Sequence, residues 1–112
     1  LDPATGETIA DLPLASAADL DEALTHAEAG FRAWRKAAPD ARAAVLTGAA
    51  ALLRERSDGI AAILTREQGK PLVEAKGELL YSAMLFEFYA GECRRSYGRT
   101  LVRPAGQRAE VR

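Results

Sequence analysis

The sequence predicts a mainly α-helical fold of about four helices, with a short N-terminal strand and a C-terminal β-hairpin. Apolar residues recur at three- and four-residue steps along most of the chain, which is the spacing of one helical face. Serine, aspartate, proline and glycine interrupt this pattern where helices typically start and stop. Near the C-terminus, two strand-like runs surround a Pro-Ala-Gly-Gln turn, as in a hairpin.

The N-terminal segment LDPATGETIADLPL contains a turn and one alternating run. Pro3 and Gly6 flank the predicted turn. Residues 8–12 place an apolar side chain at every second position, which predicts a short strand. Such a strand is too short to be stable without neighbours.

The first helix is predicted over residues 17–37. Ser16 and Asp19 have the spacing of a capping box, in which the serine oxygen accepts an amide and the acid complements the helix dipole. Pro39 marks the end of the pattern. The apolar stripe of this helix comprises Leu20, Ala23, Leu24, Ala27, Phe31 and Trp34.

Two further helices are predicted before Gly69. Asp40 is the expected N-cap of the second, which runs to about Arg56 and presents a stripe rich in alanine. Ser57 and Asp58 provide the next cap, and a short third helix follows. Gly69 is expected to end this helix.

The longest helix is predicted to start at Pro71 and to stop at Gly98, which is expected to take the left-handed C-terminal position, with Arg94 and Arg95 in the last turn. Its apolar stripe comprises Leu72, Ala75, Leu79, Ala83, Phe86, Ala90, Cys93 and Tyr97. Hairpin strands are expected over residues 99–103 and 108–112. An isolated hairpin is marginal and alanine stripes form a modest core, so we expect an incomplete piece that packs against protein outside this chain.

The composition is that of an ordinary soluble globular protein, with 112 residues, 48% hydrophobic and 28% charged. A net charge of −1 without a basic face argues against a nucleic-acid partner. We find neither an apolar run of about 18 residues nor a signal peptide, so no membrane association is expected. The single cysteine favours a reducing compartment and a cytoplasmic location.

The Gly69-Lys70 pair ahead of an apolar-periodic run suggests a phosphate-binding loop, but the details do not fit. The upstream glycine is missing, Pro71 replaces the hydroxyl residue, and the preceding segment is helical in pattern. A helix stop followed by a helix start is the favoured interpretation. We expect Lys70 to form an exposed charge ladder with Glu74, which explains Glu74 and Glu78 without acid–base chemistry.

The remaining reactive residues are expected to be structural. Cys93 lies on the apolar stripe near a helix C-terminus, which is the wrong dipole end for a nucleophile, so a buried inert thiol is predicted. His26 is expected to be a solvated helix residue without metal partners, and no metal site is predicted. Solvated faces or helix ends are the expected positions of Arg54, Arg56, Arg66, Arg94, Arg95 and Arg99.

Taken together, the segments resemble the N-terminal region of aldehyde dehydrogenases. The matching pieces are DPATGETIADLPLAS, AGFRAWRKAAPDARAAVLTGAAALLRERSDGIAAILTREQGKPLVEAKGE and FYAGECRRSYGRT, which cover nearly the whole chain. Within that superfamily, EQGKPLVEAKGELLYSAMLFEFYAGE is most similar to the succinate-semialdehyde dehydrogenase branch, which also tends to carry tyrosine at the position of Tyr81.

The resemblance implies an α/β enzyme with a Rossmann-type cofactor domain that oxidises an aldehyde with NAD or NADP. In such enzymes a cysteine thiolate attacks the aldehyde, hydride passes to NAD(P)+, and glutamate-activated water releases the acid. The catalytic and dinucleotide-binding residues of the family lie outside this chain, so no catalytic or cofactor-binding residue is assigned to it. We therefore expect the fragment to bind no cofactor and to be inactive alone.

The resemblance also implies a domain division and one site residue. Residues 1–98 correspond to the helical part of the cofactor-binding domain, and residues 99–112 to the start of an oligomerisation hairpin in a homodimer or homotetramer. The catalytic domain is absent from this chain. Tyr81 is expected at the wall of the substrate tunnel, with Leu80, Met84 and Leu85 as weaker neighbours.

One alternative from another class stays open on the sequence. A complete, small helical interaction module, binding a partner through its alanine-rich stripes or its hairpin, would also lack catalytic groups. The encoding reading frame separates the two hypotheses. A stop codon after Arg112 favours the module, and continuation into a glycine-rich strand-helix unit favours the dehydrogenase.

Overall fold

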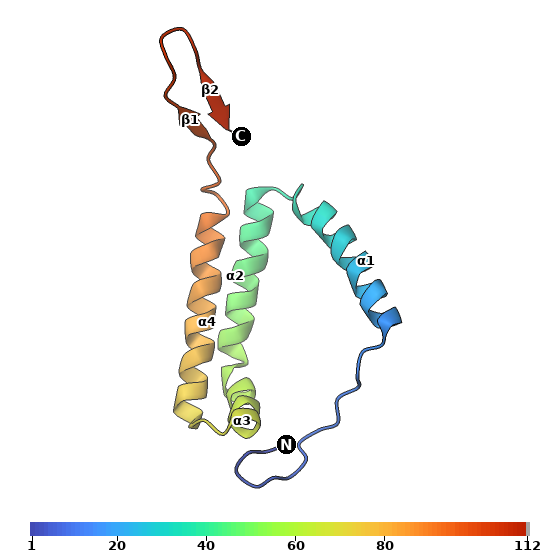
Figure 1. Cartoon of the computed structure of the whole chain (residues 1–112). Coiled ribbons are helices and arrows are strands. Elements are labelled where there is room, and N and C mark those ends of the chain that lie inside the picture. Colours follow the sequence, from blue (N-terminus) through green and yellow to red (C-terminus); the bar gives the residue numbers. More distant parts are fainter. Residues whose placement is uncertain (112) are drawn as a thin grey trace.

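The computed structural model describes residues 1–111, and over these residues it confirms the mainly helical architecture. The elements are α1 (Ala17–Trp34), α2 (Pro39–Glu55), α3 (Ser57–Gln68), α4 (Leu72–Glu92), β1 (Arg99–Leu101) and β2 (Ala109–Val111). Helices α2 and α4 run side by side in opposite directions, with α3 between them in sequence and at one end of the pair (Figure 1). No helix in residues 1–111 combines the length and the apolar character needed to cross a membrane.

Helix α1 begins with the predicted capping box. The Ser16 hydroxyl oxygen accepts the Asp19 backbone N–H at 3.2 Å, and Asp19 Oδ2 accepts the Ser16 backbone N–H at 2.7 Å. The hydrogen bond from the Ser16 backbone, followed by that from its hydroxyl, holds the pKa of Asp19 below its usual value of 3.8. The helix ends at Trp34, earlier than predicted, because Lys36 and Ala37 form tighter turns back to Ala33 and Trp34.

Acid should therefore loosen the start of α1. A carboxyl group with a lowered folded-state pKa contributes stability above its ordinary pKa, and that stability is lost as the pH falls through the lowered pKa. We expect the helical Cα chemical shifts of residues 17–20 to move toward coil values between pH 5 and pH 2 in an NMR titration. Asp19→Asn should abolish this step, whereas Asp21→Asn should leave it in place. An unchanged N-terminal turn at pH 2 would contradict the prediction.

Helices α2 and α3 begin differently from the prediction. Pro39 is the first residue of α2 and Ala38 its N-cap, so Asp40 is not the cap. Asp40 Oδ1 instead accepts a hydrogen bond from Arg94 Nε at 2.6 Å. The ring of Pro39 fixes its φ at a helical value, which favours the start of the helix at this residue. Ser57 is likewise the first residue of α3, is buried, and follows Arg56 as the N-cap. Ser57 is therefore a buried residue of the first turn and not the cap of α3.

Alanines form the contact between the helices. We call the six of them the alanine seam: Ala43, Ala50, Ala61, Ala75, Ala83 and Ala90. Among the described residues, these are all of the buried hydrophobic side chains. The two on α2 are seven residues apart, as are Ala83 and Ala90 on α4, so each pair lies on one side of its helix. Single methyl groups let the helix backbones approach closely but bury little apolar surface.

Helix α4 ends at Glu92, short of the predicted end near Tyr97. The Arg94 and Arg95 amides bond to carbonyls three residues back, which tightens and closes the last turn. Helix α2 starts at Pro39, level with this point, so a longer α4 would have no neighbour there. Gly98 does not adopt a left-handed conformation either, since the positive-φ glycines of residues 1–111 are Gly6, Gly69 and Gly106.

The C-terminal hairpin is confirmed with shorter strands than predicted. β1 and β2 pair antiparallel with Arg99 opposite Val111 and Leu101 opposite Ala109. The turn closes with the Gln107 amide bonded to the Pro104 carbonyl at 3.1 Å. Arg112, the predicted last strand residue, lies outside the described residues.

The predicted N-terminal strand over residues 8–12 is wrong. This segment has no strand assignment, because β1 and β2 of the described chain pair with each other and neither lies beside it. The predicted turn is present, with the Gly6 amide bonded to the Asp2 carbonyl at 2.7 Å. Pro3 of this turn packs against Gly69, at the end of α3.

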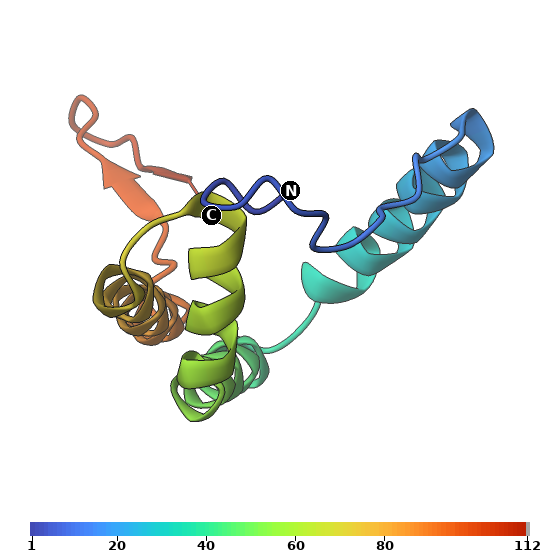
Figure 2. The same cartoon turned by 90° about the horizontal axis from the view of Figure 1, so that it is seen from below.

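The overall shape is extended. Figure 2 shows α1 angled away from the other three helices. The radius of gyration is 21.0 Å, whereas a compact domain of this length has about 13 Å. The accessible surface is 9193 Å², against about 6,000 Å² for a compact monomer of this mass. The chain thus leaves far more surface open than a self-contained domain does.

Candidate functional site

The face of α4 that points away from α2 is the principal candidate surface. It carries Val73, Tyr81, Met84, Leu85 and Phe88, which we call the outer face of α4. These residues are exposed, and they recur at three- and four-residue steps on the side opposite the alanine seam. A helix that is apolar on both sides is normally buried on both sides. The outer face therefore has the character of a surface that meets a ligand or another part of a protein.

The structure brings three of the four predicted tunnel residues together. Tyr81, Met84 and Leu85 share the outer face because they are one helical turn apart, and the Tyr81 side chain is 60% exposed. Leu80 lies toward the flank of α4 and is less exposed, at 36%. Phe88, which the sequence argument did not single out, extends the same face by one turn and packs edge-on against Tyr89 with ring centroids 5.3 Å apart. The role of Tyr81 stays a prediction.

The Gly69-Lys70 stretch forms the predicted helix stop. Gly69 caps α3 with φ 75°, and its amide bonds to the Thr65 carbonyl at 2.8 Å. The predicted ladder with Glu74 is wrong, because Lys70 Nζ bonds to Glu78 Oε1 at 2.6 Å. Lys70 precedes the first residue of α4, so the spacing rule for two residues within one helix does not apply to it.

The same stretch does not fit a dinucleotide phosphate. The Gly69 amide and the Lys70 ammonium, the two groups that would face an anion, already have protein partners. Pro71 follows directly and has no amide hydrogen to donate. We therefore assign no cofactor contact to these residues and route no chemical step through them.

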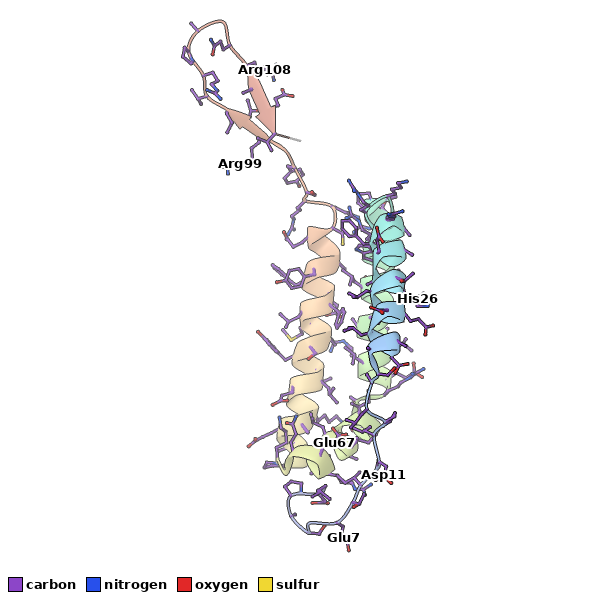
Figure 3. The ribbon with its side chains drawn as sticks, turned by 45° about the vertical axis from the view of Figure 1, so that its right-hand side comes forward. Glu7, Asp11, His26, Glu67, Arg99 and Arg108 are labelled. Carbon is purple, nitrogen blue, oxygen red and sulfur yellow. The ribbon has the colours of Figure 1, made fainter. Side chains whose placement is uncertain are left out.

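The remaining reactive residues occupy surface or helix-end positions. His26 Nε2 lies 3.5 Å from Glu22 Oε1, both side chains are exposed, and Figure 3 shows His26 on α1, well away from Glu67 and the other labelled acids. Cys93 was predicted to be buried; it is half-buried, because α4 ends just before it. Within residues 1–111, we find no group of three His, Cys, Asp or Glu placed to hold a metal ion.

Ion pairs between helices surround the alanine seam and were not anticipated. Arg54 of α2 donates to Glu87 of α4 through two bonds, Nε to Oε1 at 3.2 Å and a terminal nitrogen to Oε2 at 2.8 Å. The hydrogen bond to Glu87, and then the charge of that carboxylate, raise the pKa of Arg54. Arg94, just after the end of α4, pairs with Asp40 in the first turn of α2. The partners are 33 and 54 residues apart, so no local spacing could reveal them.

Two more apolar surfaces lie open. The stripe of α1 is exposed along its length, with Phe31 61% and Trp34 43% exposed, and within the described residues α1 buries no side chain. An open groove of about 320 Å³ runs between α2, α3 and α4. Its lining comprises Ala49, Leu52, Leu53, Arg56, Ile60 and Phe86. Open faces of this extent are typical of surfaces that contact further protein.

Comparison with known proteins identifies the family. The model of the aldehyde dehydrogenase family matches residues 1–112. A 4-(hydroxymethyl)benzenesulfonate dehydrogenase of Comamonas testosteroni is 46% identical over 110 residues, or 97% of this chain and 23% of the relative. A succinate semialdehyde dehydrogenase [NAD(P)+] of Escherichia coli is 46% identical over 90 residues, or 80% of this chain and 20% of the relative.

A solved structure supports the same family assignment. The crystal structure of succinate-semialdehyde dehydrogenase from Burkholderia pseudomallei superimposes with a TM-score of 0.88 at 44% identity, covering 96% of this chain and 22% of that one. The chain thus spans between a fifth and a quarter of the length of these proteins. The family model matches the whole chain, and the solved structure superimposes on nearly all of it. This chain therefore belongs to the aldehyde dehydrogenase family.

Proposed function

We propose that residues 1–112 are the N-terminal, non-catalytic part of an NAD(P)+-dependent aldehyde dehydrogenase that oxidises an aldehyde to a carboxylic acid. The observation that carries the proposal is the family match over the whole chain, although the chain spans only 20 to 23% of its relatives. The large apolar surface left open on α1 and α4 supports the same view, because it requires more protein to cover it.

In the whole protein, the catalytic cysteine, the glutamate that activates water and the dinucleotide-binding glycines would lie outside this chain. NAD(P)+ would supply the hydride acceptor. We propose that residues 1–98 form the helical part of the cofactor-binding domain and that the outer face of α4 borders the aldehyde path. Residues 99–112 would begin the hairpin of a homodimer or homotetramer. The hairpin of the described residues is a two-stranded sheet, which is only marginally stable by itself, and this supports that role.

For the substrate we propose an aldehyde that carries an acid group, with succinate semialdehyde as the first candidate. The compounds in the names of the two relatives share an acid group, which is a sulfonate in 4-(hydroxymethyl)benzenesulfonate and a carboxylate in succinate semialdehyde. A site built to bind an anion leaves its charged donors unpaired when a neutral analogue enters, and this discriminates strongly. Succinate semialdehyde and butanal provide a matched pair with and without the acid group.

The test uses the longer protein that contains this chain, purified and assayed for NAD(P)H formation. We expect kcat/KM for succinate semialdehyde to exceed that for butanal by at least about tenfold. Residues 1–112 alone should give no turnover with either cofactor. Turnover by the isolated chain would contradict the proposal that the catalytic residues lie outside it. Equal kcat/KM for both aldehydes would contradict the proposed substrate class.

Replacing Tyr81 by alanine in the longer protein should raise the KM for the aldehyde by about tenfold and change the KM for NAD(P)+ by less than about twofold. The exposed ring contributes little to the packing of α4, so its removal should act on the aldehyde path and not on folding. Tyr97→Ala is the matched control, because it removes another exposed tyrosine that lies beyond the end of α4 and outside the outer face. Unchanged aldehyde kinetics in Tyr81→Ala would remove Tyr81 from the tunnel wall.

A further inference from the structure

The alanine seam holds α2 and α4 close together but specifies their register only weakly. Alanine has no atom beyond Cβ, so the fully buried part of the contact consists of single methyl groups. The larger apolar residues beside them, Leu46, Leu53 and Leu79, are only half-buried. Methyl groups restrain the rotation and sliding of α4 along α2 only weakly, so polar contacts beside the seam contribute to the orientation of α4.

Arg54 and Glu87 supply such an orienting contact. The guanidinium fork makes two bonds to the two oxygens of one carboxylate, which fixes a plane as well as a distance. Helices α2 and α4 run in opposite directions (Figure 1). Side chains on a helix lean toward its N-terminus, so those of Arg54 and Glu87 can meet although they start from different levels of the helix pair. A slip of one residue would change their separation by about 1.5 Å, enough to break the paired geometry.

The other ion pairs of α4 are less restrictive. Lys70 and Lys76 each present a single ammonium that can swivel, to Glu78 and Asp58 respectively. Arg94 uses Nε alone toward Asp40, which lies at the end of the helix pair. Among the described ion pairs, the two-bond link between α2 and α4 is therefore the one that resists rotation.

We infer that the Arg54–Glu87 pair is a positioning device that sets the rotation of α4 and thereby aims Tyr81 and the rest of its outer face toward the aldehyde. The inference rests on the proposed function of that face. Glu87 lies on the same continuous helix as Tyr81, six residues further on. A rotation of about 20° would move an atom at the helix surface, about 5 Å from the axis, by about 2 Å. Displacements of about 1 Å can cost up to a hundredfold in rate.

The test is kinetic and uses the longer protein. Glu87→Gln keeps the shape but loses the charge, and Arg54→Lys keeps the charge but loses the fork. Each should lower kcat/KM for the aldehyde by about five- to tenfold, mainly through KM, and leave the KM for NAD(P)+ within about twofold. The exchanged pair Arg54→Glu with Glu87→Arg should recover most of the loss. Glu28→Gln, which removes the partner of Arg32 on α1, is the matched control and should behave like wild type.

A double-mutant cycle with Tyr81 separates this inference from the function on which it rests. If the pair acts by aiming Tyr81, Glu87→Gln should have little further effect in a Tyr81→Ala background. Wild-type aldehyde kinetics in Glu87→Gln, or full additivity with Tyr81→Ala, would overturn the positioning role while Tyr81→Ala still reports on the tunnel. The positioning role would also be overturned if the exchanged pair failed to recover kcat/KM while its thermal midpoint equalled those of the single variants.

Discussion

Replacing Ala50 by leucine should destabilise the chain by about 2 to 3 kcal/mol, because extra methylenes in a closely packed contact force backbones or rotamers to shift. Ala50 is 1% exposed and lies in the middle of α2, where the alanine seam meets α4. Leucine adds three carbon atoms where the helices are held apart by single methyl groups. The free energy of unfolding of residues 1–112, from urea titration followed by circular dichroism, gives the cost directly.

The neighbouring residue provides the control for this experiment. Ala51 is exposed on the same helix, so Ala51→Leu makes the same chemical change without entering the seam. Its effect should stay within about 0.5 kcal/mol. Equal stability of the two variants would mean that α2 and α4 do not pack through their alanines. Leucine is a good helix former, so a loss at Ala50 cannot be attributed to helix propensity.

The helices were predictable because their signals are local. A capping box at Ser16 and a glycine at position 69 act within one turn of the backbone, and both function as the sequence indicates. The long apolar pattern after Pro71 likewise needs no partner to be recognised. Its alternation of alanine with larger residues also predicted a modest core, and the alanines are the residues that became buried.

The errors concern features that depend on a second segment. A strand over residues 8–12 requires a neighbouring strand, and the described chain supplies none beside it. The end of α4 depends on where α2 begins, and the partner of Lys70 depends on the turn before α4. A backbone or side-chain group that a local pattern pairs with a near neighbour can instead form its hydrogen bond with a distant residue. The sequence alone does not show which of the two partners is preferred.

The candidate site shows the same division. The spacing of Tyr81, Met84 and Leu85 on one face follows from helical geometry, and the structure places them together. The stripe with Ala75, Ala83 and Ala90 was predicted as one apolar face of α4, and it is the face that packs against the other helices. The exposure of the opposite side, with Phe88 on it and Leu80 at its flank, became visible only in the structure.

Replacing Gly69 by alanine should destabilise the chain by about 2 to 3 kcal/mol, through two additive causes. The left-handed backbone at φ 75° costs an alanine about 1 to 2 kcal/mol. The added Cβ would also lie 3.0 Å from Pro3 Cγ, closer than carbon atoms normally approach. Relief of this contact requires Pro3 and its turn to shift by a few tenths of an ångström away from the end of α3. Urea unfolding gives the total cost, and protection of the Gly6 amide from hydrogen exchange reports on the turn.

Gly6→Ala separates the two causes. Gly6 has the same φ of 75°, and an added Cβ there would meet nothing within 4 Å, so this variant should show the backbone cost alone. Combining Pro3→Ala with Gly69→Ala removes the ring atom from the contact and should recover the difference between the two glycine variants. If Gly69→Ala costs no more than Gly6→Ala, the turn yields freely and does not hold the N-terminal segment against α3. If the double variant recovers nothing, the extra cost has another source than Pro3.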